Sequence, residues 1–311
     1  MSYLFTNIIG VFVFDKNFRI VDKILFKTIG DYKNKEKSEG ALKAKHRNLQ
    51  EPDIAKALEF FRDKQYFNDF YTKNIQLTKE AIKKSVAADS LIIQTISNIE
   101  ELAKTINLLV KRLREWYSLY NPEFSNSIQN HEKFVELILA KDKKTLLKEI
   151  NASESMGSDL NKENIEPILS LARQIKSMYN LKQQQETYLN IIMKKTCPNM
   201  LEITGPQLGA KLVESAGSLE RLTKFPASTI QLLGAEKALF RHMKNKKNLC
   251  PKYGILHEHP FITKVKNKNQ GKAARTIADK LSIAVKVDYF KGNFIGDKLK
   301  QDIERRIKSL K

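Results

Sequence analysis

Apolar residues recur with heptad spacing between residues 92 and 117, and this pattern restricts the possible fold more than any other feature. Two columns follow the alternating four- and three-residue intervals of a coiled-coil seam. They are Ile92, Ile99, Ile106 and Leu113, and then Ile96, Ala103, Val110 and Tyr117. A third column, formed by Leu102, Leu109 and Trp116, widens the apolar stripe and favours a helix with more than one neighbour.

A second long helix is expected from about Asn164, a candidate N-cap with Pro167 in the first turn, to the break at residues 197–199. The first helix ends at Asn121-Pro122. Between them, residues 131–150 predict two short helices, and the polar residues 151–161 predict a loop. The two long helices therefore predict an antiparallel hairpin about 45–50 Å long, with an insertion at its tip.

The chain begins with strand-like segments. Residues 7–15 and 19–26 are rich in β-branched and aromatic side chains, and Asp15-Lys16-Asn17 supplies a turn between them. Helical patterns follow at residues 41–47 and 52–64, separated from the strands by an expected surface loop at residues 33–40. This combination predicts a small α/β domain that ends near residue 82.

Glycine and proline punctuate the last third of the chain into short helices. Five are expected, at residues 205–216, 218–224, 228–242, 271–281 and 297–311. The fold class is therefore mainly α with a small α/β N-terminal domain. Three domains are predicted: the α/β domain at residues 1–82, the antiparallel coiled-coil hairpin at 83–197, and an all-α domain at 198–311.

Positive charge is concentrated in one part of the chain. The net charge is +20 for 311 residues, and residues 241–280 alone hold eleven basic and two acidic side chains. A general compositional bias toward lysine would spread the charge evenly, whereas a cluster indicates a surface for a polyanion such as nucleic acid.

The run from Lys224 to Arg241 leads directly into this basic stretch. Gly234 lies inside an apolar helical pattern, where glycine costs about 1 kcal/mol relative to alanine, so a backbone is expected to approach closely there. An amphipathic helix with a solvated charged face is the alternative interpretation. Further on, Lys252 beside Tyr253 offers a phosphate contact and a stacking surface, although a core tyrosine with a solvated lysine would give the same pair.

Several functional classes lack support in the sequence. No P-loop, nucleotide fingerprint or nucleophilic triad is present, and no catalytic set or cofactor site is predicted. His257 and His259 with Cys250 have poor spacing for zinc, so no metal site is expected. Two cysteines do not make a disulfide framework, and no apolar run is long enough for a membrane helix or resembles a signal peptide.

A second binding mode is suggested by Gly205-Pro206 and the later run Gly217-Ser218-Leu219-Glu220. Glycine at these positions resembles a helix-hairpin-helix module, which binds DNA phosphates through backbone amides. Glycine caps between short helices are common in all-α domains, so this pattern has low specificity.

Several segments from about residue 85 to the end resemble the Nop family of box C/D guide ribonucleoproteins in order and spacing. They include Arg114-Glu115-Trp116-Tyr117, Ser155-Met156-Gly157, Pro226-Ala227-Ser228-Thr229, Gly234–Arg241 and Pro251-Lys252-Tyr253-Gly254. The first 82 residues match only in pattern. The chain stops at Lys311 without the lysine-rich tail usual in eukaryotic relatives, which points to an archaeal member or a shortened chain.

The resemblance implies a non-catalytic scaffold for RNA-guided 2′-O-methylation of rRNA or tRNA. Its N-terminal domain would hold the methyltransferase fibrillarin, which would bind S-adenosylmethionine, and its coiled coil would form a homodimer. The Nop domain would bind box C/D guide RNA together with a ribosomal-type kink-turn-binding protein. A spliceosomal Nop-domain scaffold is a variant. The location would be cytoplasmic in an archaeon and nucleolar in a eukaryote.

Two groups of residues are expected to carry these roles. The expected RNA contacts are Gln231, Glu236, Lys237, Arg241, Lys244, Lys246, Lys247, Lys252, Lys268, Lys272 and Arg275. The expected self-association residues are Ile92, Ile96, Ile99, Ile106, Leu109, Leu113 and Trp116.

Overall fold

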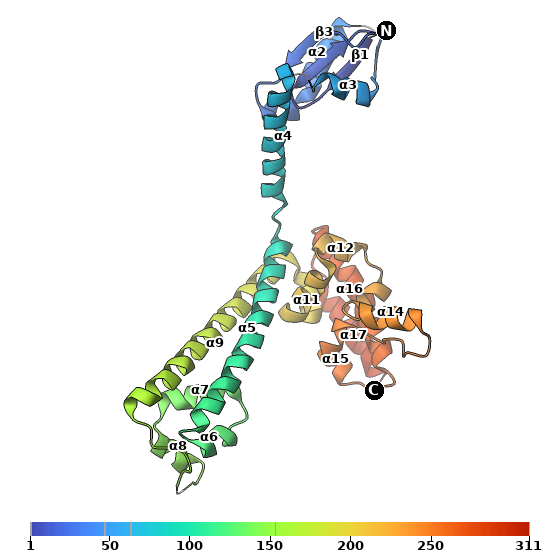
Figure 1. Cartoon of the computed structure of the whole chain (residues 1–311). Coiled ribbons are helices and arrows are strands. Elements are labelled where there is room, and N and C mark those ends of the chain that lie inside the picture. The colour runs from blue at the N-terminus through green and yellow to red at the C-terminus, as the bar shows by residue number, and fades with distance from the viewer. Residues whose placement is uncertain (1, 47, 63, 153, 311) are drawn as a thin grey trace. The chain divides into compact units, whose positions relative to one another are not determined.

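A computed structural model describes residues 2–46, 48–62, 64–152 and 154–310 (Figure 1). These residues form two compact units, Met1–Ala87 and Ala88–Lys311. The described residues are mostly helical, with one four-stranded sheet in the first unit, which confirms the predicted fold class. No helix in the described ranges combines the length and the apolar character needed to cross a membrane.

The sheet of the first unit has the strand order β3-β2-β1-β4. Its strands are β1 (Ser2–Thr6), β2 (Gly10–Phe14), β3 (Ile20–Leu25) and β4 (Leu49–Gln50). β2 pairs antiparallel with β1 and β3, and β4 pairs parallel with β1. The predicted turn is present, since the Asp15 carboxylate accepts hydrogen bonds from the backbone N–H groups of Asn17 and Arg19, both at 2.8 Å.

β2 is buried on both faces because its side chains alternate between two small cores. Phe12 and Phe14 pack in one cluster with Phe61 and Tyr66, while Val11 and Val13 pack in the other with Leu42. Leu42 lies in α2 (Lys35–Lys45) and Tyr66 in α4 (Lys64–Ser85), while Phe61 directly follows α3 (Ile54–Phe60). α1 (Ile29–Lys33) contributes Tyr32, which packs against both clusters.

One expectation for the first unit needs correction, and the position of the domain end can be compared with the helix that contains it. Residues 33–40 are largely helical rather than a loop, because a capping box at Thr28 and Asp31 starts α1 and α2 follows after one residue. The expected domain end at residue 82 lies inside α4, which continues to Ser85, and the first unit ends at Ala87.

The second unit contains the predicted antiparallel hairpin of α5 (Ala88–Ser118) and α9 (Lys162–Thr196), about 46 and 52 Å long (Figure 1). The insertion consists of α6 (Pro122–Ser127), α7 (His131–Ala140) and α8 (Lys143–Glu149), and Asp142 caps α8 as the expected break point between two helices. α9 begins three residues earlier than expected, since the N-cap is Asn161, whose side chain accepts from the Asn164 N–H.

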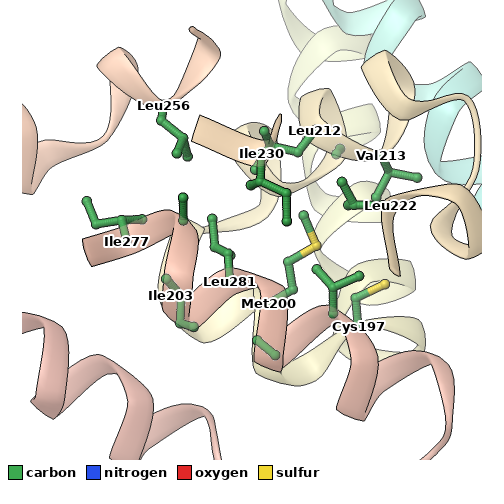
Figure 2. Packing of buried hydrophobic residues seen from close by; sticks show 14 of the residues in the cluster. Cys197, Met200, Ile203, Leu212, Val213, Leu222, Ile230, Leu256, Ile277 and Leu281 are labelled. Atoms are coloured by element: carbon green, nitrogen blue, oxygen red, sulfur yellow. The ribbon is translucent and has the colours of Figure 1, made fainter. Parts of the chain in front are cut away.

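Short helices then pack against the long helix α16 (Gln270–Tyr289) and bury its apolar face. The elements that follow α9 are α10 (Pro198–Thr204), α11 (Pro206–Ala216), α12 (Leu219–Lys224), α13 (Ala227–Leu232), α14 (Glu236–Lys244), the 3-10 helix η1 (Ile255–Glu258), α15 (Pro260–Thr263), α16 and α17 (Gly296–Lys308). Figure 2 shows Ile277 and Leu281 of α16 close to Ile230 of α13 and Ile203 of α10.

The base of the hairpin shares this core. Ile92, Ile96 and Ile99 of α5 belong to the same buried cluster as the C-terminal helices. Polar contacts reinforce the joint: Lys211 of α11 pairs with Glu100 of α5, at 3.2 Å, and the Asp89 carboxylate accepts from the Leu219 N–H, at 3.0 Å. The residues from 88 onward therefore form one packed unit, and the predicted limit at residue 198 falls within a continuous core.

Candidate nucleic-acid interface

The expected helix over residues 228–242 is two helices joined by a sharp bend. α13 ends at Leu232 and α14 begins at Glu236. Gly234 between them has φ = +85°, a region that glycine adopts without strain, and a Cβ at this position would overlap the Ile255 side chain. The group that approaches Gly234 closely is the side chain of Ile255 of the same chain, whereas a backbone was expected there.

Two of the expected RNA contacts hold this bend in place. The Gly234 N–H donates to the Glu236 carboxylate at 2.6 Å, so that carboxylate stabilises the start of α14. The Gln231 amide donates to the Lys252 carbonyl at 2.7 Å and lies 3.4 Å from the Gly271 carbonyl. The side chains of Gln231 and Glu236 are therefore engaged by the chain itself.

Three segments that are distant in the sequence converge at this point. The N–H groups of Gly254 and Ile255 donate to the carbonyls of Gln231 and Leu233, at 2.9 and 2.8 Å. Gly254 cannot carry a side chain, since a Cβ would overlap the Leu233 carbonyl. The loop before η1 is thus fixed against the α13–α14 bend and the first turn of α16.

The cationic side chains project from this frame into solvent. All nine expected basic contacts are exposed, and none of them pairs with a carboxylate within the ranges that the structure describes. We call them the basic surface: Lys237, Arg241, Lys244, Lys246, Lys247, Lys252, Lys268, Lys272 and Arg275. Unpaired cations on a rigid frame are suited to phosphate groups, which lie at fixed intervals along a nucleic acid.

Local geometry places some members of the basic surface together. Lys237, Arg241 and Lys244 follow one face of α14 at intervals of four and three residues. The aliphatic part of Lys252 lies close to Gly271, since a Cβ built on Gly271 would be 3.5 Å from the Cβ of Lys252. The side chains of Lys252 and Lys272 therefore start from neighbouring points of the surface. The structure gives no comparable link for Lys268.

Tyr253 and the nearby histidines have structural roles. The Tyr253 hydroxyl donates to Gln270 at 2.7 Å, and its ring stacks on His257. His259 is buried between the Ile203 carbonyl and the Phe261 N–H. The described residues contain no group of three or more His, Cys, Asp and Glu side chains suited to a metal ion.

The glycines of the helix-hairpin-helix pattern have a capping role. Gly217 adopts the left-handed conformation at the end of α11 and donates to the Val213 and Glu214 carbonyls. This geometry is the common C-cap of an α-helix and accounts for Gly217 without a DNA contact.

The structure divides the expected self-association residues into two groups. Ile92, Ile96, Ile99, Ile106 and Leu113 are buried inside the chain's own cores. These five side chains therefore belong to the intramolecular packing of the hairpin, because in this fold a second copy has no access to them. Leu109 is half-buried, and Trp116 is 39% exposed.

The third apolar column is the part of the pattern that remains accessible. Leu102 and Leu109 are half-buried, Trp116 is exposed, and Leu91 continues the same face of α5 toward its start. We call these four residues the α5 stripe. The sequence already shows most of the α5 stripe as a third apolar column beside the two seam columns. Only the structure shows that α9 covers the seam columns and leaves the third column accessible.

Comparison with known proteins agrees with the resemblance noted in the sequence. Residues 98–309 match the model of the Nop family, described as "snoRNA binding domain, fibrillarin". An uncharacterized NOP5 family protein of Methanocaldococcus jannaschii is 38% identical over 279 residues, which cover 83% of this chain and 66% of that protein.

Eukaryotic relatives match over a shorter range. Nucleolar protein 56 of Schizosaccharomyces pombe is 38% identical over 70% of this chain, and the human Nucleolar protein 56 is 35% identical over 70%. The matches cover 49% and 41% of those proteins, so the chain spans about half the length of the curated relatives it matches. A solved structure, titled as a fibrillarin/Nop5p complex, covers the whole of both chains at 24% identity with a TM-score of 0.48.

Proposed function

Because the chain belongs to the Nop family, we propose that it is a non-catalytic, RNA-binding scaffold of a box C/D guide ribonucleoprotein. The observation that carries this proposal is the basic surface, whose nine cations are exposed and whose supporting loops are fixed by backbone hydrogen bonds. In this role the surface binds the phosphates of a kink-turn guide RNA that already holds its kink-turn-binding protein.

The first unit is proposed to dock fibrillarin, which the description of the family names. The partner would supply both S-adenosylmethionine and the methyl transfer, while this chain would hold the enzyme and the guide RNA in one particle. A direct check is incubation of the chain alone with S-adenosylmethionine and guide and substrate RNA. Methyl transfer in the absence of fibrillarin would contradict the scaffold proposal.

The RNA-binding proposal is tested by the salt dependence of affinity. Lys237→Ala and Lys252→Ala should each weaken binding to a guide RNA loaded with its kink-turn protein. Each should also lower the slope of log affinity against log salt concentration by about 1, since one phosphate contact is lost. The measurement is a fluorescence titration between about 50 and 200 mM salt, the range over which phosphate contacts weaken strongly.

Lys79→Ala is the matched control, because Lys79 is exposed on α4 in the first unit. It should leave both the affinity and the slope unchanged. Binding that does not depend on salt, or loss of affinity in the control alone, would count against the basic surface. Competition by duplex DNA as strong as that by kink-turn RNA would favour the helix-hairpin-helix alternative.

Self-association is proposed to use the α5 stripe. Trp116 is the most suitable position for a substitution, because its ring is exposed. An aspartate there would be solvated in a monomer, but in a dimer its charge would be buried against an apolar surface, which is unfavourable. Trp116→Asp should lower the mass measured by sedimentation to that of one chain, while Leu249→Asp, at an exposed site outside the hairpin, should not. A wild-type chain that stays monomeric at all concentrations would overturn this part of the proposal.

A further inference from the structure

One face of α16 is exposed along nearly its whole length, while most of the other positions are buried or half-buried. The exposed positions recur at intervals of three and four residues, so they lie in one line along the helix. We call this line the α16 ridge: Lys272, Arg275, Asp279, Ile283, Lys286 and Phe290. It begins in the basic surface and extends over about 27 Å at 1.5 Å per residue.

The ridge ends in a turn that exposes three aromatic rings. Tyr289, Phe290 and Phe294 are 38%, 75% and 52% exposed. The rings of Tyr289 and Phe290 meet edge to face with their centroids 5.1 Å apart, and this leaves most of the Phe290 ring in solvent. Three exposed aromatic rings within six residues form an apolar cluster at the surface, and such clusters usually mark a binding site.

The turn is held by hydrogen bonds on both sides. The Gly292 N–H donates to the Val287 carbonyl at 2.8 Å, and the Ile295 N–H donates to the Asn199 side chain at 2.6 Å. Beneath the turn, the buried Asp288 carboxylate accepts from the backbone N–H groups of Asn199 and Met200, at 3.0 and 2.9 Å. The rings are therefore presented by a preorganised turn, which reduces the entropy lost when a ligand binds.

The charges near the aromatic turn favour an anionic ligand. Lys286 and Lys291 are exposed, and neither pairs with a carboxylate in the described part of the chain. Along the sequence from the ridge to the start of α17, the exposed acidic residues are Asp279 and Asp297. Lysines beside free aromatic rings are the combination with which proteins bind unpaired nucleotides, the lysines contacting phosphates and the rings stacking on bases.

We propose that the α16 ridge guides an RNA strand from the basic surface to the aromatic turn, where unpaired bases stack on Phe290 and its neighbours. This inference rests on the proposed RNA-binding function and adds a second contact for single-stranded RNA. The continuity of the ridge with the basic surface favours RNA over a protein partner, whose binding would not require that connection.

The test compares two fluorescent RNAs, each loaded with a kink-turn-binding protein and titrated with the whole chain. One is a blunt-ended kink-turn stem, and the other is the same stem with a single-stranded uridine tail of about ten nucleotides. The tailed RNA is prepared in two versions, one with the tail at the 5′ end and one with the tail at the 3′ end. The wild type should bind the tailed RNA at least about fivefold more tightly than the blunt RNA, as expected for one stacked base. Phe290→Ala should lose this gain and bind the blunt RNA as the wild type does.

Phe290→Trp should retain the gain, because an indole ring stacks at least as well as a phenyl ring. Phe67→Ala removes another exposed ring, which is 49% exposed and lies in the first unit, and should behave as the wild type. A 2-aminopurine in the tail should lose fluorescence when it binds the wild type and keep it with Phe290→Ala.

The outcomes separate the two proposals. A wild type that binds neither RNA contradicts the proposed function itself. A wild type that binds both RNAs equally, or a Phe290→Ala variant that keeps the tail-dependent gain, overturns only the role of the aromatic turn. Lys237→Ala should weaken both probes and leave the ratio between them unchanged.

Discussion

At the scale of single residues, Gly234 determines how the run from Lys224 to Arg241 bends. Gly234→Ala should destabilise the second unit by about 2–4 kcal/mol, because alanine is strained at positive φ and its Cβ would overlap Ile255. Gly40→Ala is the matched control: Gly40 lies within α2 with no atom near its potential Cβ. That change should stabilise the first unit by up to about 1 kcal/mol. Thermal unfolding of both variants measures the two effects, and an unchanged transition for Gly234→Ala would contradict the account of the bend.

His259 gives the second unit a pH-dependent stability. Burial lowers the pKa of His259 and Lys300 lowers it further, although the hydrogen bond to Ile203 raises it in part. The imidazole is neutral in the fold, since its Nδ1 accepts from Phe261 and its Nε2 donates to Ile203. The unfolded chain therefore binds the proton more readily, and stability should fall as the pH drops below about 6.5. The Tm should decrease more between pH 7.5 and 5.5 in the wild type than in His259→Asn, and equal decreases would contradict this.

At the scale of elements, Arg114 fastens the insertion to α5. Its guanidinium donates to the Ser125 and Ile128 carbonyls, both at 2.6 Å, and to His131 at 3.0 Å, and it lies over the Phe134 ring. Arg114→Lys should cost about 2–3 kcal/mol, because one ammonium cannot reach these acceptors together. Arg112→Lys, on the same helix with a single exposed ion pair to Glu115, should cost less than about 0.5 kcal/mol. Equal losses in denaturant unfolding would refute the role of Arg114.

The elements also show what sequence alone can predict. The hairpin and its insertion are predictable because heptad spacing, Asn-Pro and Asp caps are local signals. The bend at Gly234 is harder to predict, since apolar residues continue on both sides of it, among them Ile230, Leu233 and Leu239, and are compatible with a single helix. α4 is not predicted above, although Tyr66, Phe70 and Leu77 have helical spacing and would have indicated it.

The candidate site also has features that the sequence predicts and features that it does not. The exposed cations follow from charge density, which is a property of the local sequence. The structural roles of Gln231 and Glu236 could not be predicted, because they depend on contacts with Lys252, Gly271 and the backbone of Gly234 that exist only after folding. The burial of the α5 seam residues likewise depends on which face α9 covers.

At the scale of the whole molecule, the division into two units has a direct test. A fragment of residues 88–311 should fold and bind the loaded guide RNA with the affinity and salt slope of the full chain, because the basic surface and its supporting core lie within it. It should fail to bind fibrillarin, which is proposed to dock on residues 1–87. Fluorescence titration and gel filtration measure both, and RNA binding that is lost with the first unit would contradict this division of roles.

The shared core of the hairpin base and the C-terminal helices has a consequence for protection from solvent exchange. Ile92 and Ile96 pack in the same buried cluster as Ile230 and Ile277, so opening either side exposes the other. A ligand that binds only the closed conformation lowers the population of the open conformations. RNA bound only at the C-terminal helices should therefore slow amide hydrogen exchange at the start of α5, a segment that contributes no residue to the basic surface, and should leave the exchange of β2 in the first unit unaltered.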